Sequence, residues 1–169
     1  MTLVRATIPD AELHIFGGAE PRHREYAETV RQTVGGDLEK TVFFHGAAGD
    51  TVDRLADFDA FVVLGQDQGS PNALLEALAA GLPCIANDDG GTGEQIVHEL
   101  TGLLLPDRTP DTLAPAIVRM LSDRALAARL GAAGRARAIA EFSMIDMAAG
   151  YESLFTSLAP AQAEKEMTA

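Results

Sequence analysis

The sequence predicts an α/β fold with a doubly wound parallel sheet, and two observations support this prediction. Apolar runs of strand length alternate with stretches of helical length along most of the 169 residues. In the region 60–106, two such runs, 60–65 and 83–87, lie on either side of one capped helix, which is the order typical of parallel strands. The expected domain covers residues 1–158, and the polar segment 159–169 is expected to be a flexible tail.

The remaining elements follow from the same alternation. The expected strands are 11–16, 41–44, 60–65, 83–87 and 102–105, and the expected helices outside the region 60–106 are 21–34, 50–58, 111–121, 123–141 and 144–158. Two glycines within the range 131–134 predict a break in the helix 123–141.

The helix between the third and fourth strands has clear signals at both ends. Ser70 is expected to cap it and Pro71 suits its first turn, whereas Gly81 ends it and Pro83 prevents its continuation. The start of a helix presents unpaired N–H groups and the positive end of a dipole, so it attracts phosphate. Gly69, directly before Ser70, lets the backbone approach a ligand closely.

Glu76 lies on this helix, six residues after Ser70 and therefore ~9 Å along the axis. Helical periodicity turns it away from Leu74 and Leu78, so it points off the face that should be buried. A carboxylate in this place could hold ribose hydroxyls while the helix start holds a pyrophosphate. The alternative is that Glu76 only solvates an amphipathic helix.

The sequence EALAAGLP at 76–83, followed by GGTGE at 90–94, resembles the signature of the family 4 retaining glycosyltransferases (glycosyl transferases group 1). The resemblance covers residues 7–158 and the C-terminal, donor-binding domain of the GT-B fold, which is Rossmann-like. It implies binding of a nucleotide-diphosphate sugar and retaining transfer of the sugar to an acceptor hydroxyl. The nucleotide sugar is then a substrate, and no cofactor is expected.

The resemblance also implies roles for individual residues. Gln68 and Glu76 occupy the catalytic positions, with Glu76 holding the ribose and Gln68 contacting the transferred sugar. Gln68 stands where the family has Glu, and it keeps hydrogen bonding but loses the charge and cannot act as a base. The expected nucleotide-sugar-binding residues are Gly17, Gly18, His45, Gly46, Gly69, Ser70, Pro71, Asn72, Ala73, Glu76, Gly90 and Gly91.

Alternatives remain open at two of the neighbouring positions. His45 could contact the nucleotide, or it could form only local hydrogen bonds at the end of its strand. Glu94 could approach the donor, or it could simply favour the dipole of a following helix. Thr92 and Gln95 have the spacing of a helix capping box.

Two parts of the family's structure are missing from this sequence: the N-terminal acceptor-binding domain, and the first strand of the donor domain with its basic loop. Without that central strand, the strands 11–16 and 60–65 are expected either to leave a gap or to pair directly. We therefore expect association with a polypeptide that supplies an N-terminal half, or self-association through open strand edges. An alternative function is a catalytically silent sugar-nucleotide-binding or assembly subunit. A third possible function is that of an enzyme with a related fold that epimerises UDP-sugars.

Composition excludes several other classes. The formal charge of −12 argues against nucleic-acid binding. No apolar run reaches the length of a transmembrane segment, and the N-terminus lacks the features of a signal peptide, so a cytoplasmic location is expected. The histidines and the single cysteine, Cys84, show no metal-ligand spacing, and the loop after Gly17 lacks the G-x-G-x-x-G pattern of NAD-binding proteins.

Overall fold

The computed structural model describes residues 1–18, 23–47, 49, 51–66 and 69–158. Its strands are β1 (Leu13–Phe16), β2 (Val42–Gly46), β3 (Phe61–Val63), β4 (Cys84–Asn87) and β5 (Leu103–Leu105). Its helices are α1 (Thr2–Arg5), α2 (Arg24–Val34), α3 (Thr51–Arg54), α4 (Asn72–Ala80), α5 (Thr92–Gln95), α6 (Pro110–Ser122), α7 (Arg124–Glu141) and α8 (Met144–Leu158). Strands and helices alternate as predicted, which confirms the α/β class.

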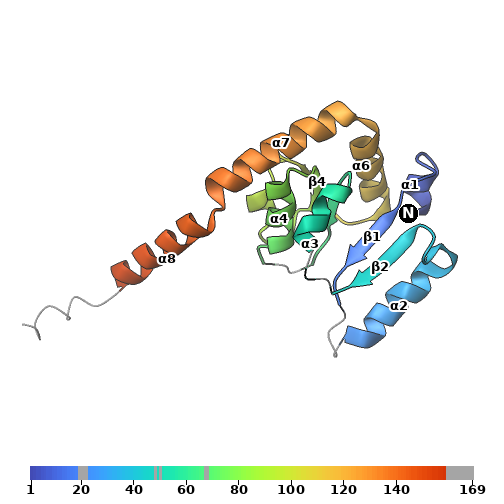
Figure 1. Ribbon diagram of the computed structural model, residues 1–169, viewed down its shortest axis with the longest axis horizontal. Coiled ribbons are helices and arrows are strands. Elements are labelled where there is room, and N and C mark those ends of the chain that lie inside the picture. The colour runs from blue at the N-terminus through green and yellow to red at the C-terminus, as the bar shows by residue number, and fades with distance from the viewer. Residues whose placement is uncertain (19–22, 48, 50, 67–68, 159–169) are drawn as a thin grey trace, which may run out of the picture.

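The strands form two separate parallel sheets. β1 pairs with β2, and β3, β4 and β5 form a three-stranded sheet in that order. Figure 1 shows β1 and β2 beside α2 and apart from the region of α4 and β4. Of the two outcomes expected without a central strand, the structure has the gap: β1 and β3 do not pair with each other.

The gap between the sheets is a cavity of about 1770 Å³. Residues 12–16 of the first sheet and 60–64 of the second line it, together with residues of α1, α6 and α7. The short helix α1 packs on α6 through Val4, which is buried with Ala11 and Ala114. One edge of β1 and one edge of β3 therefore face the same open space.

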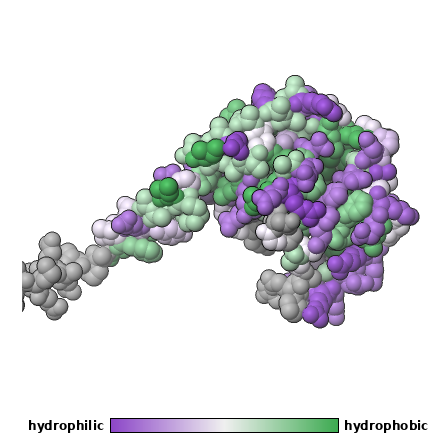
Figure 2. All heavy atoms as spheres, viewed as in Figure 1, coloured by the Kyte–Doolittle hydropathy of each residue, from purple (hydrophilic) through white to green (hydrophobic). Residues whose placement is uncertain are grey.

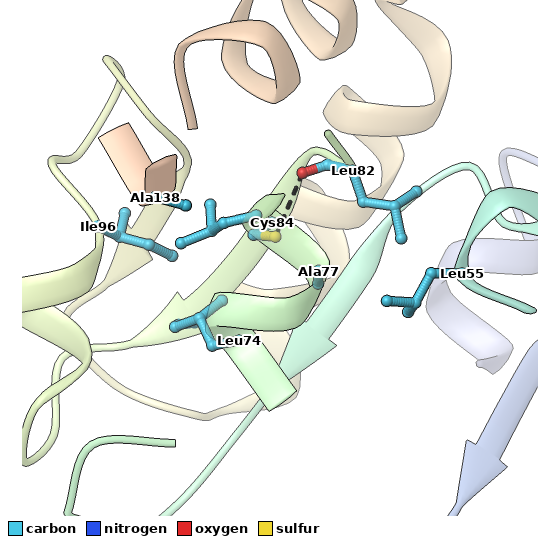
Figure 3. Packing of buried hydrophobic residues seen from close by; sticks show 9 residues of the cluster. Leu55, Leu74, Ala77, Leu82, Cys84, Ile96 and Ala138 are labelled. Carbon is cyan, nitrogen blue, oxygen red and sulfur yellow. Dashed lines mark hydrogen bonds between the residues drawn. The ribbon is translucent and has the colours of Figure 1, made fainter. Parts of the chain in front are cut away.

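The three-stranded sheet has the best-packed core. All four residues of β4 are buried, because the strand lies between β3 and β5 and is covered by helices. Leu74 and Ala77 extend from α4 toward Cys84 on β4, as Figure 3 shows. The thiol of Cys84 donates a hydrogen bond to the carbonyl of Leu82 at 3.3 Å.

Helix α4 ends where the sequence predicts, because Gly81 adopts a left-handed conformation with φ of 85°. Helix α7, in contrast, is continuous from Arg124 to Glu141, so the predicted break near residues 131–134 is wrong. Its glycines allow close packing instead. A Cβ atom on Gly131 would lie 2.3 Å from the carbonyl oxygen of Gly81, and one on Gly134 would lie 2.7 Å from a methyl group of Leu78.

Helix α8 forms over the predicted range and points away from the rest of the chain (Figure 1). Every one of its residues is exposed. Figure 2 shows hydrophobic residues along this arm. Five large exposed ones recur at intervals of three and four residues, namely Met144, Met147, Tyr151, Leu154 and Leu158, and Ile145 and Phe155 are exposed as well. Among the helices described, none is long and apolar enough to cross a membrane.

Candidate functional site

The start of α4 lies open to solvent. Pro71 is the N-cap, and the first helical residues, Asn72 and Ala73, are exposed. The N–H groups at this end precede the first intrahelical hydrogen bonds and so remain available to an anion. The predicted cap by Ser70 is wrong, because its hydroxyl accepts a hydrogen bond from the side chain of Gln95 instead.

Glu76 lies on the exposed side of α4, while Leu74 and Leu78 are buried on the opposite side, as the periodicity predicts. Glu76 and Ala73 both line the cavity between the two sheets, and Gly17 lines it from the end of β1. The carboxylate of Glu76 forms no hydrogen bond or ion pair with any described residue. Its carboxylate is therefore available to a ligand that enters the cavity.

One end of the loop between β3 and α4 is held by the side chain of Asn87, at the end of β4. The Asn87 amide donates to the carbonyl oxygen of Gly65 at 3.0 Å and accepts from the N–H of Gly65 at 2.9 Å. These two bonds resemble the bonds between paired strand residues. The side chain of Asn87 therefore extends the pairing of β3 and β4 beyond Val63. Arg108 donates a hydrogen bond to Gln66, the next residue of this loop.

The other end of the loop is held by the connection between β4 and α5. The N–H of Gly91 donates to the carbonyl oxygen of Gly69 at 2.9 Å. A Cβ atom on Gly91 would lie 3.0 Å from that oxygen and 3.0 Å from Cα of Ser70, so a side chain at this position would force the loop to shift by a few tenths of an ångström. Gln95, which is fully buried, donates to the hydroxyl of Ser70 at 2.7 Å.

The predicted capping box of Thr92 and Gln95 is wrong, since α5 begins after Gly91 without a side-chain cap. The hydroxyl of Thr92 instead donates to the backbone carbonyl of Asn87 at 2.7 Å and accepts from the N–H of Asp89 at 3.1 Å. These bonds hold the turn that carries Gly90 and Gly91 against the end of β4.

The predicted residues of the two-stranded sheet lie at its carboxyl end. The N–H of Gly17 donates to the carbonyl of Gly46 at 2.8 Å. Nε2 of His45 lies 2.9 Å from Nδ1 of His14, and its ring stacks on Phe16 with centroids 4.5 Å apart. The imidazole of His45 is thus engaged within its own sheet, which favours the local role over contact with a nucleotide.

The structure therefore divides the predicted residues into three groups. Gly17, Ala73 and Glu76 share the cavity between the sheets. Gly69 and Ser70 contact Gly91, which follows Gly90, at the end of the three-stranded sheet, and Pro71 and Asn72 begin α4. His45 and Gly46 end β2, and Gly18 lies just beyond the end of β1. Gln68 lies outside the described residues. No group of His, Cys, Asp and Glu in the described ranges could hold a metal ion.

Sequence reasoning missed three residues that shape this site: Asn87, Gln95 and Arg108. The signal for Asn87 was a polar residue directly at the end of a buried strand, facing a glycine-containing loop. Gln95 had a competing local explanation as a cap. Arg108 reaches a residue 42 positions away in the sequence, so no local pattern indicates its contact.

Comparison with known proteins identifies the family. A family model described as "Glycosyl transferases group 1" matches residues 1–123. A GDP-mannose-dependent alpha-(1-6)-phosphatidylinositol monomannoside mannosyltransferase of Mycobacterium tuberculosis is 35% identical over 86% of this chain. A GDP-mannose-dependent monoacylated alpha-(1-6)-phosphatidylinositol monomannoside mannosyltransferase of Corynebacterium glutamicum is 33% identical over 85% of this chain. The chain spans only 39% and 38% of the lengths of these relatives.

Solved glycosyltransferase structures share the fold. HepE from Anabaena, in complex with UDP and glucose, matches 94% of this chain and 45% of its own, with a TM-score of 0.78 and 21% identity. Sucrose-phosphate synthase from Thermosynechococcus elongatus matches 91% of this chain and 41% of its own, with a TM-score of 0.74 and 31% identity. The C-terminal domain of a group 1 glycosyl transferase from Francisella tularensis matches 85% of this chain and 78% of its own, with a TM-score of 0.72 and 22% identity.

These matches agree with the sequence motifs and with the arrangement around α4. The structural neighbours are GT-B glycosyltransferases, and the chain corresponds to part of their length. The chain belongs to the glycosyl transferases group 1 family.

Proposed function

We propose that this chain is the donor-binding domain of a retaining, family 4 glycosyltransferase, which transfers the sugar of a nucleotide-diphosphate sugar to an acceptor hydroxyl. The observation that carries the proposal is the pairing of an open helix start with an unpaired carboxylate. The exposed start of α4 can bind phosphate, and Glu76 lies farther along the same helix on the wall of the cavity. The transferase names of the relatives favour this function over a catalytically silent subunit.

Each part of the donor has a place in this arrangement. The backbone N–H groups of Gly69, Ser70, Asn72 and Ala73 would bind the pyrophosphate, and Glu76 would accept hydrogen bonds from the two ribose hydroxyls. Gln68 would contact the transferred sugar. Because its amide carries no charge, the stabilisation of positive charge at the anomeric carbon would come from the donor phosphate, which would also assist the incoming hydroxyl. The proposal includes neither a metal ion nor a cofactor.

GDP-mannose is the donor that we propose to test first. Both mannosyltransferase relatives named above are GDP-mannose-dependent. The structural neighbour from Anabaena binds UDP and glucose, which makes UDP-glucose the natural competitor. We further propose that the domain works in the cytoplasm.

Calorimetric titration tests the donor site. We expect saturable binding of GDP or UDP and of the matching sugar conjugate to the purified chain, with affinity reduced at least about tenfold in Glu76→Ala, since two hydrogen bonds to a charged group are lost. Glu152→Ala, on the exposed face of α8, is the matched control and should bind like the unchanged chain. A folded chain that binds none of the GDP, UDP and ADP compounds, or a Glu76→Ala variant of unchanged affinity, would contradict the proposal.

We also propose that the active enzyme contains an N-terminal half that packs against this domain. Two surfaces support this. Each of β1 and β3 pairs on one edge only and faces the cavity with the other, and α8 displays an exposed row of large apolar residues. Open strand edges and exposed apolar patches are surfaces on which proteins associate.

Light scattering after size-exclusion chromatography tests the association. We expect the chain alone to self-associate with rising concentration, and to form a defined complex when the polypeptide equivalent to the rest of the relatives is added. Replacing Met147 and Leu154 of α8 by Ser should weaken the complex while the nucleotide affinity of the chain stays unchanged. A strictly monomeric chain that transfers sugar without any partner would refute this part of the proposal.

A further inference from the structure

We infer that Gln95 is a positioning residue, which sets the direction of the backbone N–H groups at the start of α4 by clamping the loop before it. The inference rests on the proposed donor site and deepens it. Gln95 does not touch the cavity and lies 25 residues from its partner Ser70 in sequence. Its effect on a ligand would therefore pass through the loop.

The clamp consists of two hydrogen bonds from one buried amide. Nε2 of Gln95 lies 2.7 Å from the hydroxyl oxygen of Ser70 and 3.4 Å from the carbonyl oxygen of Pro71. The carbonyl of Pro71 can only accept a hydrogen bond, so this contact determines which end of the amide faces the loop. Both partners directly precede Asn72, the first residue of α4.

The other end of the amide carries a cost in stability. The side chain is fully buried, and none of the described residues donates a hydrogen bond to its Oε1. A buried acceptor without a donor costs free energy of folding. An apolar side chain of similar length would avoid that cost, so the amide serves the contact with the loop at the expense of stability.

The support behind Gln95 is rigid. Gln95 is the last residue of α5, and the first residue of that helix, Thr92, is hydrogen-bonded to the end of β4. Directly before this anchor, Gly91 makes its own backbone hydrogen bond to Gly69. Because β4 is buried along its whole length, a loop tied to this support keeps its place relative to the sheet.

The position of the loop matters for phosphate binding because hydrogen bonds depend strongly on direction. The interaction weakens steeply when the donor turns away from the acceptor. If Pro71 and Ser70 were released, the N–H groups of Asn72 and Ala73 would sample several directions and bind a diphosphate less tightly. Gln95 would thus raise affinity through preorganisation.

Gln95→Met tests this inference, with Gln32→Met on the exposed face of α2 as the matched control. We expect the amide hydrogens of Leu74 and Gly91, which are bonded to the carbonyls of Pro71 and Gly69, to exchange at least about tenfold faster in Gln95→Met than in the unchanged chain, while the exchange of β4 stays the same. The midpoint of thermal unfolding should stay equal or rise, because the unpaired Oε1 is removed. The dissociation constant for GDP or UDP should increase about five- to twentyfold.

Ser70→Ala probes the same contact from the exposed side, where a folding defect is not expected. The two substitutions combined should weaken nucleotide binding no more than the stronger one alone, since both break one contact. Unchanged exchange at Leu74 and Gly91, or faster exchange there with unchanged nucleotide affinity, would overturn the inference. The unchanged chain could bind no nucleotide while amide exchange in Gln95→Met is faster as expected. That result would support the contact between Gln95 and the loop and contradict the proposed donor site.

Discussion

The two sheets of this chain differ sharply in how well they are packed. In the three-stranded sheet, β4 is buried along its whole length and α4 presses Leu74 against it. In the two-stranded sheet, all four residues of β1 are only half-buried, and α2, the helix beside it, buries none of its residues. The same α/β pattern has thus produced one well-formed core and one incomplete one.

The parts of the proposed site therefore lie on two sheets that differ in packing. Glu76 and the loop before α4 belong to the well-packed sheet, and hydrogen bonds from the connection after β4 hold that loop. Gly17, which lies across the cavity, belongs to the sheet with little core. In the proposed site, we therefore expect the well-packed sheet to fix the loop before α4 and Glu76, and the position of Gly17 to vary more.

Paired core truncations should reveal the largest difference between the sheets. Leu74→Ala should lower the free energy of unfolding by about 3 kcal/mol, because it leaves a cavity in a fully buried core. Ile15→Ala should cost only about 1 kcal/mol, since that side chain is half-buried beside an existing cavity. Urea unfolding followed by circular dichroism measures both values.

A comparison of the same two variants by hydrogen exchange extends the test. In the unchanged chain, the amides of β1 and β2 should exchange through openings of lower free energy than those of β4. Ile15→Ala should accelerate the first group alone. Equal losses of stability in the two variants would show that the sheets unfold as one unit and would remove the distinction between them.

The order of elements could be read from the sequence because it depends on local signals. Gly81 ends α4 with the left-handed conformation that glycine allows, and the range of α8 was predicted to the residue. The break expected in α7 did not form, because Gly131 and Gly134 serve contacts with α4. Glycines that break an isolated helix and glycines that admit a neighbouring helix look identical in a sequence.

The candidate site was predictable only in part, for a similar reason. Glu76 could be placed by helical periodicity, which needs no knowledge of other elements. Gln95 and Ser70 matched capping patterns, but each found a better partner in the other once the fold brought α5 beside the loop. Tertiary contacts override local capping whenever a buried polar side chain can reach a partner across the structure.

A smaller effect, the change of stability with pH, tests how well the three-stranded sheet excludes water. Burial raises the pKa of the Cys84 thiol from its ordinary value of 9.0 to about 12. The folded state therefore keeps the thiol neutral, and its advantage is complete below pH 9 and declines as the pH rises toward 12. The loss amounts to about 1.4 kcal/mol for each pH unit in this window.

Cys84→Ala separates this effect from the titration of lysines and tyrosines, because it removes the thiol alone. We expect the difference in unfolding free energy between the unchanged chain and Cys84→Ala to shift by about 1.4 kcal/mol against the unchanged chain between pH 8 and pH 10. Parallel pH profiles of the two proteins would mean that water reaches β4 in the folded state. The three-stranded sheet would then be no better closed than its neighbour, and the precision of the site could not be ascribed to it.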